Sequence, residues 1–166
     1  MTVRVPRASR RRESGKSVFV TRSPDETEAL GRRIARGLTV PSVVLLRGCL
    51  GTGKTTLARG IAIGLGLEDS SLVNSPSFTL VNIYQAKHPI YHVDLYRLEG
   101  ERDFRSVGIE DFFGEDGVTI VEWADRLPFP ARSALAVDLD DSGGDTRTIT
   151  VSKPVRGKQK HLKFQI

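Results

Sequence analysis

The sequence predicts an α/β protein, a three-layer sandwich built around a mostly parallel, mixed central sheet. In the first half of the 166-residue chain, apolar stretches rich in β-branched residues alternate with stretches of helical period. This alternation is typical of parallel strands whose faces are covered by helices. Late in the chain, the last two apolar stretches are joined by a turn, as antiparallel strands are. The length suffices for one domain with a substantial core.

One motif indicates the chemistry of this fold. Residues 48–55 read G-C-L-G-T-G-K-T, which matches the phosphate-binding loop G-x-x-x-x-G-K-T. An apolar strand is expected before it at 42–47 and a helix after it at 56–65, the context that the motif requires. Glycines allow backbone N–H groups to surround a phosphate, and the helix N-terminus adds positive potential. We therefore expect a P-loop NTPase in which Lys54 reaches the β- and γ-phosphates and the Thr55 hydroxyl binds Mg²⁺.

The net charge of +5 is distributed unevenly along the chain. Residues 1–16 carry six basic side chains and one acidic one, and residues 153–166 carry five basic side chains and no acidic one. Residues 17–152 carry 14 basic and 19 acidic side chains. We expect a disordered basic tail at 1–16, a single P-loop ATPase domain at 17–152 and a second basic tail at 153–166. The tails are either solvated extensions or contacts for RNA or an acidic partner.

Composition also excludes several classes of protein. No apolar stretch approaches the length that crosses a membrane, and residues 1–16 lack the apolar segment of a secretory signal. Cys49 is the single cysteine, so an internal disulfide is impossible, which fits a reducing compartment. We expect a cytoplasmic protein without a membrane partner.

The segment before the motif predicts a strand and a well-capped helix. Residues 17–21 form a short apolar stretch, expected to be an edge strand. Ser23 is the expected N-cap, Pro24 the first helical residue, and Glu26 the acid that completes a capping box. Gly37 is expected to end this helix. Its apolar face consists of Leu30, Ile34 and Leu38.

The rest of the chain predicts five strands and little helix. Residues 74–78 are a polar loop in which Pro76 opposes a helix, and 103–113 carry one or two short amphipathic helices. The first two of the expected strands form a hairpin, and the last two are joined by a turn at Gly143-Gly144. The expected strands are 78–84, 90–96, 118–123, 134–139 and 146–151.

Two acids follow apolar strands and are candidates for the metal site of a P-loop protein. Such a protein needs a carboxylate near its metal, normally at the C-terminal end of a neighbouring strand. Asp94 follows the apolar stretch that starts at Ile90, and Glu122 follows 118–121. We interpret His92, which shares a strand face with Asp94, as a partly buried structural residue, and Trp123 as part of the core or of an interface.

Four segments in this order resemble the TsaE (YjeE) family, the bacterial ATPase of the machinery that makes the tRNA modification N6-threonylcarbamoyladenosine. The similarity covers approximately residues 17–151 and is most specific in the D-L-Y-R-L and V-E-W sequences. The matching segments are 48–56, 74–81, 91–98 and 121–124.

The resemblance implies a protein that binds ATP with Mg²⁺ and hydrolyses it slowly alone. It implies TsaD and TsaB as partners, within a complex that activates hydrolysis, and contact with tRNA only through that complex. Thr55 and Glu122 would hold Mg²⁺, Asp94 would lie near the γ-phosphate and the attacking water, and 75–79 would be a switch loop. The expected catalytic residues are Asp94, Glu122 and Lys54. The expected nucleotide-binding residues are Gly48, Cys49, Leu50, Gly51, Thr52, Gly53, Lys54, Thr55, Thr56, Thr27, Asp94 and Gly143.

One position departs from the family pattern, which usually has aspartate after the first glycine of the P-loop. Here Cys49 replaces it, which removes a carboxylate near the phosphates and places a thiol near a helix N-terminus. We expect nucleotide binding to survive, because the N–H groups and Lys54 are retained.

Three other functions stay open at this point. A small-molecule kinase would need an acceptor pocket and an Arg-rich lid, and no such lid is evident. A GTP-binding switch would use D-x-x-G, present at 140–143, but also an N-K-x-D-type segment, whereas neither Asn74 nor Asn82 is followed by lysine. A non-catalytic module with a vestigial P-loop would not be expected to keep Lys54, Thr55 and both acids.

Overall fold

The computed structural model describes residues 11–13, 15–113, 116–131 and 133–153. Within them an eight-stranded sheet has the order β1-β2-β8-β7-β3-β6-β5-β4. The helices are α1 (Pro24–Ala35), α2 (Lys54–Gly64) and α3 (Glu101–Val107), with short 3₁₀ turns η1 (Ser70–Leu72), η2 (Ile109–Phe112) and η3 (Ala124–Arg126). The strands are β1 (Arg11–Glu13), β2 (Lys16–Thr21), β3 (Ser42–Arg47), β4 (Val81–Tyr84), β5 (Ile90–Asp94), β6 (Val118–Glu122), β7 (Leu135–Asp141) and β8 (Arg147–Ser152).

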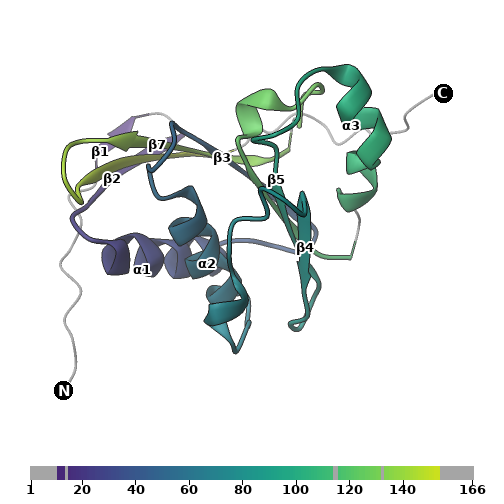
Figure 1. Cartoon of the computed structure of the whole chain (residues 1–166). Helices are drawn as coiled ribbons and strands as arrows, with labels where there is room; N and C mark the ends of the chain where they lie inside the picture. Colours follow the sequence, from purple (N-terminus) through teal and green to yellow (C-terminus); the bar gives the residue numbers. More distant parts are fainter. Residues whose placement is uncertain (1–10, 14, 114–115, 132, 154–166) are drawn as a thin grey trace.

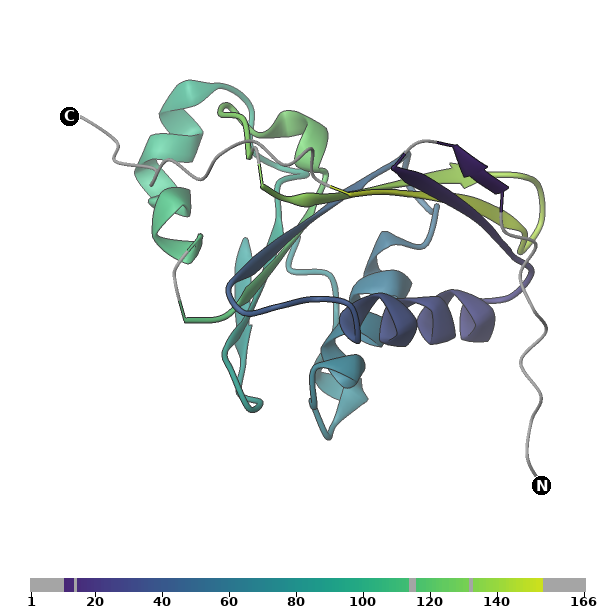
Figure 2. The ribbon, with the colours of Figure 1, turned by 180° about the vertical axis from the view of Figure 1, so that it is seen from behind.

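The expected α/β sandwich is confirmed. The four central strands, β7, β3, β6 and β5, are mutually parallel, whereas β4 at one side and β8, β2 and β1 at the other pair antiparallel. Helices α1 and α2 cover one face of the sheet, and α3 with η2 and η3 covers part of the other (Figures 1 and 2). One apolar cluster fills each of the two interfaces.

Helix α1 begins as the sequence predicts. Ser23 is the N-cap, and its Oγ accepts a hydrogen bond of 3.2 Å from the Glu26 backbone N–H. The Glu26 carboxylate accepts a bond of 2.8 Å from the Arg22 N–H, one residue earlier than in a standard capping box. At the other end, the helix stops at Ala35 with Arg36 as its C-cap, and Gly37, whose N–H donates to the Ile34 carbonyl, does not adopt the left-handed conformation of a capping glycine. Local sequence therefore defines the start of this helix.

The start of the chain differs from the expectation. We expected disorder throughout 1–16, but Arg11–Glu13 forms β1, and β2 begins at Lys16 rather than at residue 17. Strand β2 is consequently not an edge strand, because β1 pairs with its outer side. Gly15, with a φ of 83°, adopts the left-handed conformation that this tight connection requires. Residues 1–10 and 154–166, where the remainder of both expected tails falls, lie outside the described residues.

The hairpin in the middle of the chain is shorter than predicted. Strand β4 begins at Val81 rather than at residue 78, because the preceding residues turn back on themselves: the Leu80 N–H donates to the Pro76 carbonyl, and Leu80 has a φ of 66°. Strand β5 ends at Asp94 rather than at residue 96. The antiparallel pairing itself is confirmed, as is the β7–β8 hairpin. The strand predicted at 118–123 is present and ends one residue earlier, at Glu122.

Helices α1 and α2 pack closely against each other through glycines. A Cβ atom at Gly31 would overlap the Leu57 carbonyl oxygen, and one at Gly60 would overlap the Glu28 carbonyl oxygen. The two backbones thus approach more closely than any side chain would allow. This contact fixes α2, the helix that follows the P-loop, against the rest of the domain.

Replacing Gly60 with alanine should destabilise the domain by about 1–3 kcal/mol, because the new methyl group meets backbone that cannot move aside. The sign is diagnostic, since glycine to alanine inside a helix ordinarily stabilises by up to about 1 kcal/mol. Gly37→Ala is a control for the substitution itself at a position beyond the end of α1, where a Cβ lies 3.4 Å from its nearest neighbour. Urea unfolding measures both variants. A Gly60→Ala variant as stable as the native protein would refute the close helix contact.

Candidate functional site

The P-loop connects β3 to α2, as the motif requires. Gly51 and Gly53 have φ values of 79° and 93°, and Gly48 has one of 141° with no room for a side chain beside the Leu139 carbonyl. The N-cap of α2 is Gly53, and no side chain caps the helix. The first N–H groups of α2 are therefore available to an anion, and the helix dipole favours negative charge there.

Lys54 is the central cation of this region. Its side chain is buried, and its Nζ donates hydrogen bonds of 2.7 Å and 2.8 Å to the carbonyls of Gly48 and Cys49. The ammonium also lies 3.9 Å from the centre of the Trp123 ring, within cation–π distance. Burial lowers the pKa of Lys54 below its ordinary value of 10.5, and the nearby carboxylates of Glu122 and Asp94 oppose that shift.

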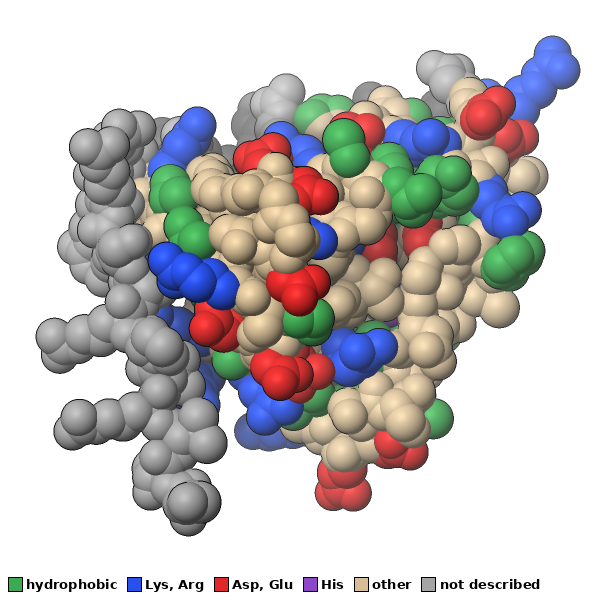
Figure 3. All heavy atoms as spheres, turned by 60° about the vertical axis from the view of Figure 1, so that its left-hand side comes forward, with side chains coloured by type: hydrophobic (Ala, Val, Ile, Leu, Met, Phe, Trp, Pro, Cys, Tyr) green, Lys and Arg blue, Asp and Glu red, His purple; other side chains and the backbone are tan. Residues whose placement is uncertain are grey.

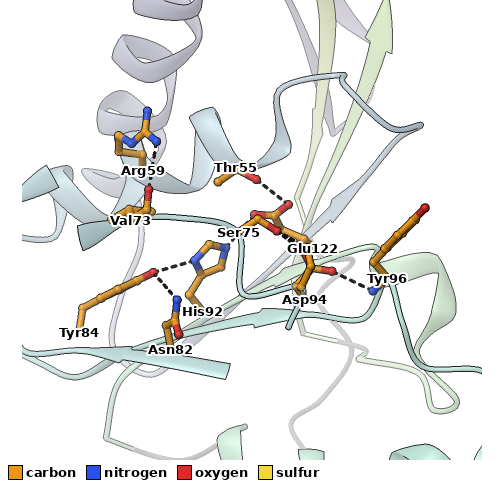
Figure 4. A network of polar contacts seen from close by, with 11 residues as sticks. Thr55, Arg59, Val73, Ser75, Asn82, Tyr84, His92, Asp94, Tyr96 and Glu122 are labelled. Atoms are coloured by element: carbon orange, nitrogen blue, oxygen red, sulfur yellow. Dashed lines mark hydrogen bonds and ion pairs between the residues drawn. The ribbon is translucent and has the colours of Figure 1, made fainter. Parts of the chain in front are cut away.

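Thr55 and Glu122 meet at the point where the P-loop approaches β6. The Thr55 hydroxyl donates a hydrogen bond of 3.0 Å to Oε2 of Glu122, whose side chain is buried (Figure 4). The other carboxylate oxygen, Oε1, lies 2.8 Å from Nε2 of His92. The two residues expected to hold a metal are thus brought together.

Asp94 lies beside Glu122 because β5 and β6 pair in parallel, with these two residues in register. Its Oδ2 accepts hydrogen bonds from the hydroxyls of Ser75 (2.6 Å) and Ser77 (2.9 Å), and its Oδ1 accepts one from the Tyr96 N–H. The polar loop before β4 is therefore attached to this carboxylate. Sequence reasoning located Asp94 but not these partners, which only the three-dimensional course of the loop brings near.

Of the remaining predicted nucleotide-binding residues, all but Gly143 lie in the P-loop or next to it. Thr27 is buried in α1 next to Gly53, with its hydroxyl 2.8 Å from that of Thr21. Gly143 lies in the β7–β8 turn, and Arg147 of that hairpin donates a 3.2 Å hydrogen bond to the Gly51 carbonyl. Cys49 and Leu50 are exposed at the tip of the P-loop, Thr52 is buried, and Thr56 lies in the first turn of α2.

Sequence reasoning missed three contacts of this site. It assigned His92 a structural role, whereas His92 is fully buried and bonded to Glu122. It placed Trp123 in the core or an interface, whereas its ring also faces the Lys54 ammonium. It gave no role to Arg147 at the P-loop. The alternation of His92 with Asp94 on one strand face was the only signal for the first contact.

Comparison with known proteins places the chain among proteins of one pathway. Residues 21–149 match the family described as threonylcarbamoyl adenosine biosynthesis protein TsaE. The chain belongs to the TsaE family. Its function therefore lies in the biosynthesis of threonylcarbamoyladenosine in tRNA, as the sequence resemblance implied.

Several relatives carry the full name tRNA threonylcarbamoyladenosine biosynthesis protein TsaE. The one from Bacillus subtilis is 38% identical over 135 residues, covering 78% of this chain and 81% of the relative. The one from Streptomyces coelicolor is 37% identical, covering 74% and 87% of the two chains. The crystal structure of Bacillus subtilis YdiB superposes with a TM-score of 0.67 at 32% identity, over 84% of this chain and 86% of that one.

The face of the domain shown in Figure 3 is mixed in charge. On this face, acidic and basic side chains of the described residues are interspersed, and neither sign forms a continuous patch. Among the described residues, no helix is both long and apolar enough to cross a membrane.

Lys54 should make stability depend on pH. Because its pKa is lower in the folded than in the unfolded protein, the unfolded state binds the proton more tightly, and folding becomes more favourable as pH rises toward 10.5. The native protein should therefore gain unfolding free energy relative to Lys54→Met as the pH rises toward 10.5. Urea unfolding at a series of pH values below 10.5 measures the difference. The exposed Lys87→Met is the control, and a difference that is flat or that falls with pH would contradict the burial of the ammonium.

Proposed function

We propose that this protein binds ATP with Mg²⁺ and hydrolyses it slowly, and that it does so in support of TsaD and TsaB as they form threonylcarbamoyladenosine in tRNA. The observation that carries the proposal is the meeting of Thr55 with Glu122 at the uncapped N-terminus of α2. Phosphate-binding N–H groups and two oxygen ligands for a hard cation thus lie side by side.

The oxygen donors fit Mg²⁺ in kind and in number. Among the described residues, no group of three or more histidine, cysteine, aspartate or glutamate side chains could hold a metal ion. Mg²⁺ does not need such a group, because it is usually bound through one or two protein oxygens together with phosphates and water. Thr55 and Glu122 would supply those two oxygens. When bound, the ion would neutralise charge that develops on the phosphates.

Lys54, Asp94 and the 75–79 segment would each have a separate role in binding and hydrolysis. Lys54 would exchange its bonds to the Gly48 and Cys49 carbonyls for bonds to phosphate oxygens, which accept from an ammonium more strongly than a neutral carbonyl does. Asp94 would orient the attacking water. In the present arrangement the hydroxyls of Ser75 and Ser77 occupy its Oδ2, so the 75–79 segment would act as a switch that controls when this carboxylate is free.

Cys49 bears on the proposal in one respect. The structure places it exposed at the tip of the loop, and its backbone carbonyl accepts the hydrogen bonds from Lys54 and Thr52. Replacement of the usual aspartate therefore leaves the hydrogen bonds that shape the loop intact. Nucleotide binding should not depend on this side chain.

Glu122→Gln and Asp94→Asn should each lower ATP turnover by roughly a hundredfold or more while ATP still binds, because such carboxylates act mainly on the transition state. Lys54→Ala should instead abolish tight ATP binding. Calorimetry measures ATP affinity, and phosphate release measures turnover, with and without added TsaD and TsaB. Asp116→Asn, a change at an exposed position outside this site, is the control.

Each result separates the proposal from its alternatives. Native affinity in Lys54→Ala would remove the P-loop assignment, and near-native turnover in Glu122→Gln or Asp94→Asn would reduce that residue to a charge at a strand end. Turnover that TsaD and TsaB do not change would contradict the proposed partnership. Transfer of phosphate to a metabolite rather than to water would indicate a kinase.

A further inference from the structure

A chain of hydrogen bonds crosses the sheet interior from the polar loop to the P-loop. The Thr79 hydroxyl donates to Oδ1 of Asn82 (3.0 Å), and Nδ2 of Asn82 donates to the Tyr84 hydroxyl (3.4 Å). The Tyr84 hydroxyl lies 3.1 Å from Nδ1 of His92, and Nε2 of His92 lies 2.8 Å from Oε1 of Glu122 (Figure 4). Strands β4, β5 and β6 each contribute one or two of these side chains.

The partners of this chain fix its direction. The Glu122 carboxylate can only accept, so the His92 nitrogen that faces it, Nε2, must carry the proton. In the neutral ring Nδ1 is then an acceptor, and the Tyr84 hydroxyl must donate to it. Burial raises the pKa of the Tyr84 phenol, which keeps that proton in place. Asn82 donates to the same hydroxyl, so every donor along the chain has an acceptor.

We propose that His92 is a positioning residue for the metal site, which holds Oε1 of Glu122 so that Oε2 is presented to the Thr55 hydroxyl. Tyr84 supports this arrangement by donating its hydroxyl proton to Nδ1 of His92. The inference rests on the proposed function, since it assigns the orientation of a ligand to Mg²⁺. A buried carboxylate with one oxygen bonded to His92 and the other to Thr55 cannot rotate without breaking both bonds.

Loss of the His92 donor should affect the metal more than the nucleotide. Replacing a residue that orients a metal ligand typically lowers metal affinity by about 10- to 100-fold. The P-loop N–H groups and Lys54, by contrast, do not contact His92 in any described hydrogen bond. The ratio of nucleotide affinities with and without Mg²⁺ therefore isolates the role of His92.

The test is calorimetric titration of the native protein and its variants with AMP-PNP, a non-hydrolysable ATP analogue, in EDTA and in Mg²⁺. In His92→Phe, the factor by which Mg²⁺ strengthens AMP-PNP binding should fall by roughly tenfold or more. The affinity for AMP-PNP in EDTA should stay within about threefold of the native value. His92→Gln keeps an N–H donor and should recover most of the loss. Tyr84→Phe should show a smaller loss of the same kind, because Nδ1 of His92 loses the hydroxyl that donates to it, and nitrogen NMR of the native protein without nucleotide should place the proton of His92 on Nε2.

Tyr91→Phe is the matched control for Tyr84→Phe. It likewise removes a tyrosine hydroxyl. The Tyr91 hydroxyl lies on β5 and donates to the exposed Asp116 carboxylate, outside the series of hydrogen bonds that ends at Glu122. An unchanged Mg²⁺ effect in His92→Phe, an equal loss in EDTA and in Mg²⁺, or a His92→Gln variant as impaired as His92→Phe would overturn the inference. If His92→Phe fails to fold, His92→Gln and Tyr84→Phe decide by the same ratio. Failure of the native protein itself to bind AMP-PNP would overturn the proposed function, and this inference with it.

Discussion

The parallel pairing of β3 with β6 is the constraint on which the candidate site depends. Leu46, the last residue but one of the strand that leads into the P-loop, is in register with Glu122. Thr55 and Glu122 therefore meet although 67 residues separate them along the chain. Strand β5 continues the parallel order and brings Asp94 beside Glu122. Because parallel strands end at the same edge of a sheet, topology collects these residues where α/β proteins commonly bind ligands.

The P-loop is held in place from several directions. Below it, α2 is fixed by its close contact with α1 at Gly31 and Gly60. Beside it, the β7–β8 hairpin contributes Arg147, which bonds to the Gly51 carbonyl. Within it, Lys54 bonds to two of the loop carbonyls. A loop held in this way can present its N–H groups without a large loss of conformational entropy on binding.

Sequence and structure agree wherever a local pattern decides the outcome. The P-loop depends on glycine conformations within eight residues, and the start of α1 depends on Ser23, so neither required knowledge of distant residues. Asp94 and Glu122 could be found as well, because each is an acid at the end of an apolar strand. Membership of the family was readable from the same short segments.

The features that escaped prediction depend on contacts distant in sequence or on exceptional backbone. The bond between His92 and Glu122 requires the register of β5 against β6, which no periodicity reveals. The shortened β4 follows from the positive φ of Leu80, an uncommon conformation for a side chain of that size. Strand β1 is short and its basic composition is typical of disorder, so pairing with β2 could not be read from it.

The central claim is that nucleotide phosphates and a divalent cation bind where the P-loop meets β6. The most direct test is a crystal structure of the protein with AMP-PNP and Mn²⁺, in which anomalous scattering locates the metal. The expected result is phosphates surrounded by the N–H groups of 48–55, with Mn²⁺ bound to the Thr55 hydroxyl and to Glu122 directly or through one water. A nucleotide bound elsewhere, or a metal that contacts neither Thr55 nor Glu122, would contradict the claim.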